Sequence, residues 1–131
     1  MNIYKHLMNQ AIEARKMSYS PYSGFSVGAA LLCEDGTVYL GCNIENAAYS
    51  PTNCAERTAF FKAISEGKRN FKAIAIVGGA DKLVPCYPCG VCRQIMSEFC
   101  DSHQFEVICG DSLDSLEIMK LEELLPKGFQ L

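Results

Sequence analysis

The chain has 131 residues, of which 49% are hydrophobic and 21% charged, and its net charge is −3 at pH 7. This length suits a single domain over residues 1–131, and the apolar fraction is sufficient for one core. The basic residues are scattered, and no apolar run approaches the roughly 18 residues of a membrane span, which argues against nucleic-acid-binding and membrane proteins. Because the first residues lack the pattern of a secretory leader, we expect a soluble, cytoplasmic protein.

The first part of the chain predicts a helix followed by a hairpin. Apolar residues recur at spacings of three and four over about residues 2–16, which is typical of an amphipathic helix. Two apolar stretches follow, over residues 25–33 and 37–43, and the Asp-Gly turn between them indicates a β-hairpin. We therefore expect the first two strands to be antiparallel.

The rest of the chain alternates helices and strands. The expected elements are helices over about residues 54–66 and 90–99, strands over 71–77 and 105–109, and a short helical turn near 121–125. Helices that alternate with buried strands cover both faces of a sheet. The pattern therefore predicts an α/β protein, a three-layer α/β/α sandwich on a mixed sheet.

The chain contains eight cysteines, and nothing in it indicates secretion. In a reducing compartment, clustered cysteines favour metal binding or chemistry, and isolated ones favour packing as small apolar side chains. The isolated ones are Cys33, Cys42, Cys100 and Cys109. We expect these four to be buried structural residues.

Two cysteine clusters form a candidate zinc site. Cys54 stands at the start of one predicted helix, and Cys89 and Cys92 lie three residues apart at the start of another. Three thiolates fill three tetrahedral corners around Zn²⁺, and a water in the fourth corner distinguishes a catalytic zinc from a structural one. Helix starts also favour thiolate over thiol. We expect one Zn²⁺ per chain, bound by Cys54, Cys89 and Cys92.

Glu56 has two interpretations. Asn53 followed three residues later by Glu56 matches a capping box, in which the carboxylate would accept a backbone N–H at the helix start. Beside a metal, the same carboxylate is positioned to accept a proton from a coordinated water. The zinc-like spacing of the cysteines favours the second interpretation.

Cys86 offers a fourth sulfur, because Cys86-Tyr87-Pro88-Cys89 is a second Cys-x-x-Cys. Four thiolates would make a closed, structural zinc site, so a structural zinc-binding module is the non-enzyme alternative. Pro88 should break any helix that reaches back to Cys86. We therefore expect Cys86 to lie outside the ligand set.

Four segments, in the right order, resemble the zinc-dependent cytidine deaminase family. They are the two cysteine motifs together with Ser-Pro-Tyr-Ser-Gly-Phe-Ser-Val-Gly-Ala-Ala at 20–30 and Gly-Cys-Asn-Ile-Glu-Asn-Ala-Ala-Tyr at 41–49. The similarity is to the small, homotetrameric, three-cysteine type, and it implies a cytidine deaminase-like fold with a mixed five-stranded sheet. The implied reaction is hydrolytic deamination of cytidine and 2′-deoxycytidine to uridine and 2′-deoxyuridine, with release of ammonia, in pyrimidine salvage.

The resemblance also implies roles for individual residues. Glu56 would take a proton from the zinc-bound water, the resulting hydroxide would attack C4 of cytosine, and Glu56 would return protons to the ring nitrogen and the departing amine. Arg57 would hydrogen-bond the ligand sulfurs and offset their surplus negative charge. The implied substrate contacts are Asn43 and Glu45 with the ribose, Phe25 with the pyrimidine face, and the Ala55 backbone with the base.

Tyr49 and Phe129 are similar to family residues that reach a neighbouring subunit's site, which implies a homotetramer with shared active sites. From chemistry alone, Phe25 and Tyr49 could be core aromatics, Phe129 part of a frayed terminus, and Asn43 and Glu45 polar residues at a strand end. Two other deaminase classes stay as alternatives. A blasticidin S-type nucleoside deaminase would share the zinc chemistry, whereas a polynucleotide deaminase would need the basic, aromatic channel that this acidic chain lacks.

Overall fold

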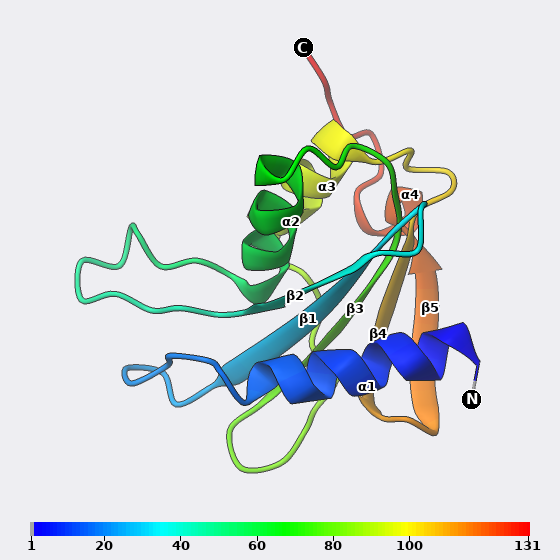
Figure 1. The fold of residues 1–131 in the computed structure, drawn as a ribbon. Coiled ribbons are helices and arrows are strands. Elements are labelled where there is room, and N and C mark those ends of the chain that lie inside the picture. The colour runs from blue at the N-terminus through cyan, green and yellow to red at the C-terminus, as the bar shows by residue number, and fades with distance from the viewer. Residues whose placement is uncertain (1) are drawn as a thin grey trace.

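The computed structural model describes residues 2–131, which form a five-stranded sheet with helices on both faces (Figure 1). The strands are β1 (Ser26–Cys33), β2 (Val38–Cys42), β3 (Phe71–Gly79), β4 (Glu106–Ser112) and β5 (Ser115–Lys120). The helices are α1 (Ile3–Arg15), α2 (Ala55–Ser65), α3 (Gly90–Phe99) and α4 (Leu121–Leu124). None of these helices is long and apolar enough to cross a membrane.

The sheet is mixed, with strand order β2-β1-β3-β4-β5. β1 is antiparallel to both β2 and β3, β4 is parallel to β3, and β5 is antiparallel to β4. The parallel pair needs a crossover connection, and α3 lies in that connection. The hairpin between β1 and β2 closes at Gly36, whose φ of +91° suits glycine, so the predicted antiparallel start of the sheet is confirmed.

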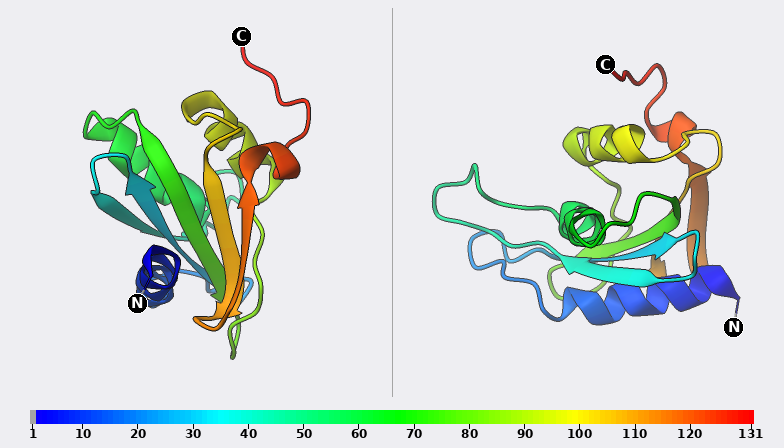
Figure 2. Two further views of the ribbon diagram at one scale, coloured as in Figure 1. Left: turned by 90° about the vertical axis from the view of Figure 1, so that its right-hand side faces the viewer. Right: turned by 45° about the horizontal axis from the view of Figure 1, so that its top comes forward.

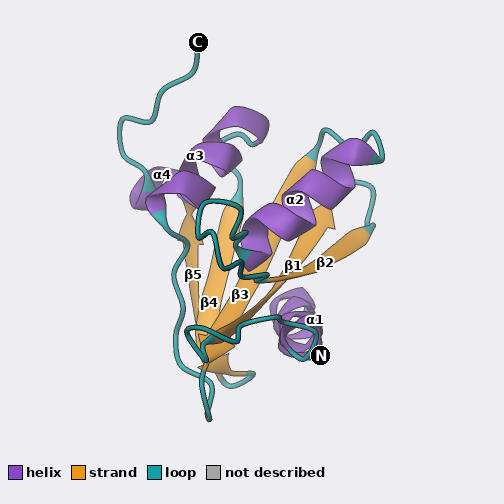
Figure 3. Cartoon of the chain, turned by 90° about the vertical axis from the view of Figure 1, so that its left-hand side faces the viewer, coloured by secondary structure: helices purple, strands orange, loops and turns teal. Residues whose placement is uncertain are grey.

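The helices form two layers around the sheet. α1 covers one face, and α2 and α3 lie side by side over the other, as Figures 2 and 3 show. Successive residues of β1 alternate between the layers: Ala29 and Leu31 pack in the core beneath α2 and α3, and Ala30 and Leu32 pack beneath α1. The predicted three-layer α/β/α sandwich is confirmed.

Two glycines allow helices to approach the sheet closely. A Cβ atom on Gly28 of β1 would lie 2.0 Å from the carbonyl oxygen of Ala11 in α1. A Cβ atom on Gly41 of β2 would lie 2.3 Å from the carbonyl oxygen of Ala55 and 2.6 Å from the backbone nitrogen of Ala59. The first turns of α2 therefore pack directly against the backbone of β2, which fixes the position of the helix start relative to the sheet.

The structure differs from the sequence predictions in three details. β5 was implied by the resemblance but not located, and only Met119 among its six residues is buried, so the strand carries no clear alternation. β3 and β4 extend two and three residues beyond their predicted ends, to Gly79 and Ser112. Cys33, Cys100 and Cys109 are buried as expected, but Cys42 is only half-buried because β2 lies at the sheet edge.

Candidate metal centre and active site

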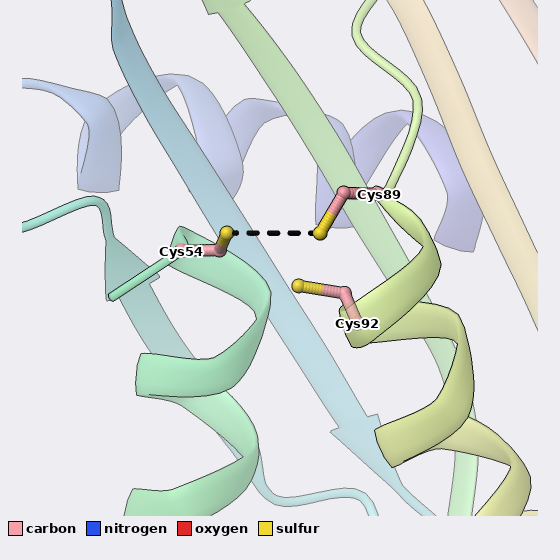
Figure 4. A group of neighbouring side chains, drawn as sticks. All are labelled: Cys54, Cys89 and Cys92. Carbon is pink, nitrogen blue, oxygen red and sulfur yellow. Dashed lines mark hydrogen bonds between the residues drawn. The ribbon is translucent and has the colours of Figure 1, made fainter. Parts of the chain in front are cut away.

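The two cysteine clusters meet where α2 and α3 begin. Cys54 is the N-cap residue of α2, Cys89 is the N-cap residue of α3, and Cys92 lies in the first turn of α3. Their three sulfur atoms lie within 4.8 Å of one another, with 4.0 Å between those of Cys54 and Cys89. Figure 4 shows the three side chains pointing into the space between the two helix starts. This arrangement brings three soft donors together as a tetrahedral zinc site requires.

The surroundings of the sulfurs favour negative charge. Nη2 of Arg57 donates a hydrogen bond of 3.1 Å to Sγ of Cys54. The pKa of Cys54 is lowered to about 5, first by the hydrogen bond from the Cys92 thiol and then by Arg57. The same bond, together with burial, raises the pKa of Cys92. A set of sulfurs in which one is already ionised suits a soft cation.

Glu56 lies beside this cluster with only 5% of its surface exposed. Burial raises the pKa of its carboxyl to about 7, and the nearby charge of Cys54 adds to the increase. The capping-box interpretation is wrong, because Cys54 is the N-cap of α2 and the helix start has no side-chain cap. The Asn53 amide instead donates to Oγ1 of Thr58, at 3.1 Å. Glu56 is therefore a buried, protonatable group next to the sulfurs.

Cys86 lies beside the cluster but does not belong to it. The grouped sulfurs among residues 2–131 are those of Cys54, Cys89 and Cys92. Cys86 is half-buried, and burial raises the pKa of its thiol to about 11. Its Sγ and the Phe25 ring both approach Gly78, where an added Cβ would lie 3.2 Å from the sulfur and 2.8 Å from ring atom Cε1. Cys86 and Phe25 thus meet over the same glycine.

The structure gives Asn43 a role in holding the backbone. Its Nδ2 donates to the carbonyl of Phe25 at 2.9 Å, and its Oδ1 accepts the Val27 N–H at 2.9 Å and the Ser18 hydroxyl. These contacts fix the backbone around Phe25, which directly precedes β1. The sequence suggested either a substrate contact or an incidental polar residue, and it did not indicate this backbone role.

Glu45 holds the turn that precedes Phe25. Its carboxylate accepts the N–H groups of Tyr22 and Ser23 at 3.0 and 3.1 Å, and the Ser23 hydroxyl at 2.5 Å. The Ser23 hydroxyl is the main reason why the pKa of Glu45 is lowered. Ser23 was not among the candidate residues, although the run of hydroxyl residues before β1 was a usable signal. The carboxylate thus stays ionised and orders the loop beside Phe25.

The remaining predicted residues fall into two groups. Ala55 is fully buried as the first residue of α2, next to Cys54 and Glu56. Tyr49 and Phe129 are 78% and 64% exposed. Tyr49 belongs to the loop between β2 and α2, which extends away from the sheet in Figure 1, and Phe129 belongs to the segment that follows α4. Neither aromatic ring is part of this chain's core.

The family model for the cytidine and deoxycytidylate deaminase zinc-binding region matches residues 1–108. The chain belongs to this family. It is 54% identical over 123 residues to the cytidine deaminase of Sporosarcina psychrophila, covering 94% of this chain and 88% of that protein. It is 51% identical over 123 residues to the cytidine deaminase of Halalkalibacterium halodurans, covering 94% and 91%.

Solved structures of cytidine deaminases have the same fold. The crystal structure of the enzyme from Burkholderia pseudomallei is similar with a TM-score of 0.88 and 44% identity, over 98% of this chain and all of that one. The enzyme from Mycobacterium tuberculosis gives a TM-score of 0.82 at 36% identity, over the full length of both chains. As a member of this deaminase family, the protein has a zinc-binding region, and the sulfurs of Cys54, Cys89 and Cys92 form a group that could hold a metal ion.

Proposed function

We propose that this protein hydrolyses cytidine and 2′-deoxycytidine to uridine and 2′-deoxyuridine, with release of ammonia, as part of pyrimidine salvage in the cytoplasm. The observation that carries the proposal is the buried carboxyl of Glu56 beside three grouped sulfurs. The similarity to cytidine deaminases over most of the chain supports the substrate class. A structural zinc module would not need a buried acid at this position.

Zinc bound by the three cysteines would lower the pKa of a coordinated water from 15.7 to about 7, which makes it a nucleophile at neutral pH. Glu56 would carry two protons in turn: its carboxylate accepts one from the attacking water and gives it to the ring nitrogen, then accepts the remaining proton of the hydroxyl added at C4 and gives it to the departing amine. The burial that raises the pKa of Glu56 favours this role, because it makes the carboxylate a better proton acceptor. Arg57 offsets the surplus negative charge of three thiolates around one divalent ion.

The substrate contacts are proposed on the same basis. Phe25, directly before β1, is 37% exposed and offers an accessible ring for a pyrimidine. The Asn43 amide nitrogen has two hydrogens and donates one to Phe25, which leaves the other for a ribose hydroxyl. Glu45 is an ionised acceptor for the ribose. The Ala55 backbone, between Cys54 and Glu56 at the start of α2, would contact the base.

Tyr49 and Phe129 support a homotetramer with shared active sites. Both are large, exposed aromatic residues on segments outside the sheet, and such residues are enriched at protein interfaces. Sedimentation should show a tetramer, and Phe129→Ala should raise KM for cytidine. A fully active wild-type monomer would contradict the shared site.

The decisive test is Glu56→Gln, with Glu98→Gln as the matched control on the exposed side of α3. We expect Glu56→Gln to keep one zinc per chain and to lose at least about 100-fold in kcat on cytidine. The control should retain both. Equal turnover of Glu56→Gln and wild type would point to a structural zinc module, and turnover of blasticidin S in place of cytidine would assign the alternative substrate.

A further inference from the structure

Arg93 connects two parts of the chain that lie on either side of α3. Its Nε donates a hydrogen bond of 2.7 Å to the carbonyl of Pro88, and its Nη1 donates one of 2.6 Å to the carbonyl of Leu124. Pro88 directly precedes the metal-site residue Cys89, and Leu124 is the last residue of α4. One half-buried guanidinium therefore joins the approach to the metal site to the end of the last helix.

Cys89 follows a segment without regular secondary structure. The chain from Ala80 to Cys89 forms no helix or strand, and Cys89 caps α3 without any side-chain cap hydrogen bond. Pro88 has no N–H, so its carbonyl is the only backbone group through which that residue can be held by a hydrogen bond. Arg93 binds this carbonyl. It therefore fixes the backbone immediately before the most exposed of the three grouped cysteines.

The geometry requires an arginine. A guanidinium is a rigid, planar group whose several donors point in fixed directions, whereas a lysine ammonium is a compact charge on a flexible stem. Nε and Nη1 of Arg93 reach two carbonyls that are 36 residues apart in sequence, which follows from the numbers of Pro88 and Leu124. Hydrogen bonds from a charged donor are roughly twice as strong as neutral ones. Replacing the guanidinium thus releases both backbone segments at once.

The second carbonyl brings in the end of the chain. Beyond Leu124, the Gln94 side chain donates to the carbonyl of Phe129 at 3.1 Å. The Gln130 side chain donates to the carbonyl of Ser97 at 2.5 Å. α3 therefore contacts the last part of the chain through Arg93, Gln94 and Ser97, while its first turn carries Cys92. Arg93 therefore links the position of the segment after α4 to the position of the Pro88 carbonyl.

We propose that Arg93 is a positioning residue for the metal site. By holding the Pro88 carbonyl it sets where the Cys89 sulfur stands relative to those of Cys54 and Cys92. Because Arg93 also binds the Leu124 carbonyl, the position of the Cys89 sulfur depends on how the segment after α4 packs against α3. This inference rests on the zinc-binding role of the three cysteines and adds a link between that site and the end of the chain.

The test compares the full-length, zinc-loaded protein with Arg93→Gln and Arg93→Lys. The matched control is Arg69→Gln, because Nη1 of Arg69 also donates to two backbone carbonyls, those of Ile64 and Lys68, but outside the metal site. Two readouts report on the metal itself: the rate of zinc transfer to a chromogenic chelator, and the visible absorption bands of the cobalt-substituted protein.

We expect Arg93→Gln to release zinc about tenfold faster or more and to shift the cobalt bands, since partners that orient ligands affect metal affinity by roughly that amount. Arg93→Lys should lie between it and wild type, and Arg69→Gln should match wild type. A folded Arg93→Gln with wild-type release and unshifted bands would overturn the proposal.

If Arg93→Gln does not fold, Arg93→Lys decides the question in the same way. Faster zinc release from Arg93→Lys supports the positioning role, and release at the wild-type rate overturns it. Failure of the proposed function would look different. A wild-type protein without stoichiometric zinc would contradict the metal site, whatever the behaviour of the Arg93 variants.

Discussion

The guanidinium of Arg57 lies 3.1 Å from the sulfur of Cys54, and the two residues are three positions apart at the start of α2. A cation in the first turn of a helix opposes the helix dipole, so this position carries a local cost. The contact with a sulfur that is ionised in the absence of metal offsets that cost. The main role of this contact is therefore at the metal site, because it does not help to stabilise the helix start.

Arg57→Gln should weaken zinc binding by about tenfold or more, because the charge that offsets the thiolates is lost. Competition with a chelator of known affinity measures the effect directly. Arg57→Lys keeps the charge and should retain part of the affinity. Wild-type affinity in Arg57→Gln would mean that the hydrogen bond contributes nothing to the site.

Cys86→Ser should keep one zinc per chain and wild-type turnover, because its sulfur lies outside the group formed by the three other cysteines. Cys89→Ser is the matched variant in the same segment, and it should lose most of the bound metal since it removes one of three ligands. Metal analysis after gel filtration distinguishes the two. Loss of zinc from Cys86→Ser would show that Cys86 is a zinc ligand after all.

Gly41→Ala should reduce both stability and metal retention. The added methyl group would lie 2.3 Å from the Ala55 carbonyl oxygen, so α2 must move away from β2 and take Cys54 with it. Overpacking of this kind costs roughly 1–3 kcal/mol. Gly90→Ala is the control, because its Cβ would meet no atom within 4 Å at the start of α3. Thermal unfolding and zinc content of both variants, measured together, test the expectation.

The Asp35–Lys68 pair, at 2.6 Å, should make a small, pH-dependent contribution to stability. The hydrogen bond from Lys68 lowers the pKa of Asp35 to about 2, from an ordinary value of 3.8. A lowered carboxyl pKa stabilises the folded state above pH 3.8, and the contribution is lost as the pH falls towards 2. Asp35→Asn should therefore lower Tm slightly at pH 7, by less than about 3 °C for an exposed pair.

The difference in Tm between wild type and Asp35→Asn should shrink between pH 5 and pH 3. Thermal unfolding followed by circular dichroism at pH 7, 5 and 3 measures it. A difference that grows as the pH falls would contradict the assigned direction of the pKa shift.

Local sequence predicted the metal site well, because each cysteine cluster coincides with a helix start. The three sulfurs come together when the starts of two helices converge, which groups Cys54, Cys89 and Cys92. The alternation of helices and strands already implied such a layered arrangement. The capping pattern at Asn53 failed because α2 begins one residue later than that pattern requires. A shift of one residue is within the usual uncertainty of a helix boundary.

Contacts between distant segments could not be predicted. Asn43 bonds to Val27 and Phe25, and Arg93 bonds to Leu124, and in each case the partner is a backbone group that leaves no mark on side-chain patterns. β5 was not located because its side chains are mostly exposed, so hydrophobic alternation gave no signal. In each case the prediction would have required knowledge of which distant segments contact one another.

The helices α2 and α3 both begin at a cysteine that makes no capping hydrogen bond. Protein helices commonly begin with a serine, threonine, aspartate or asparagine whose side chain accepts a hydrogen bond from the first free N–H groups, and in α2 and α3 a cysteine occupies that position instead. With zinc bound as proposed, the sulfur that replaces the usual oxygen would be a metal ligand, so one ion would anchor two helix starts. Metal uptake would then be coupled to the final ordering of both helices.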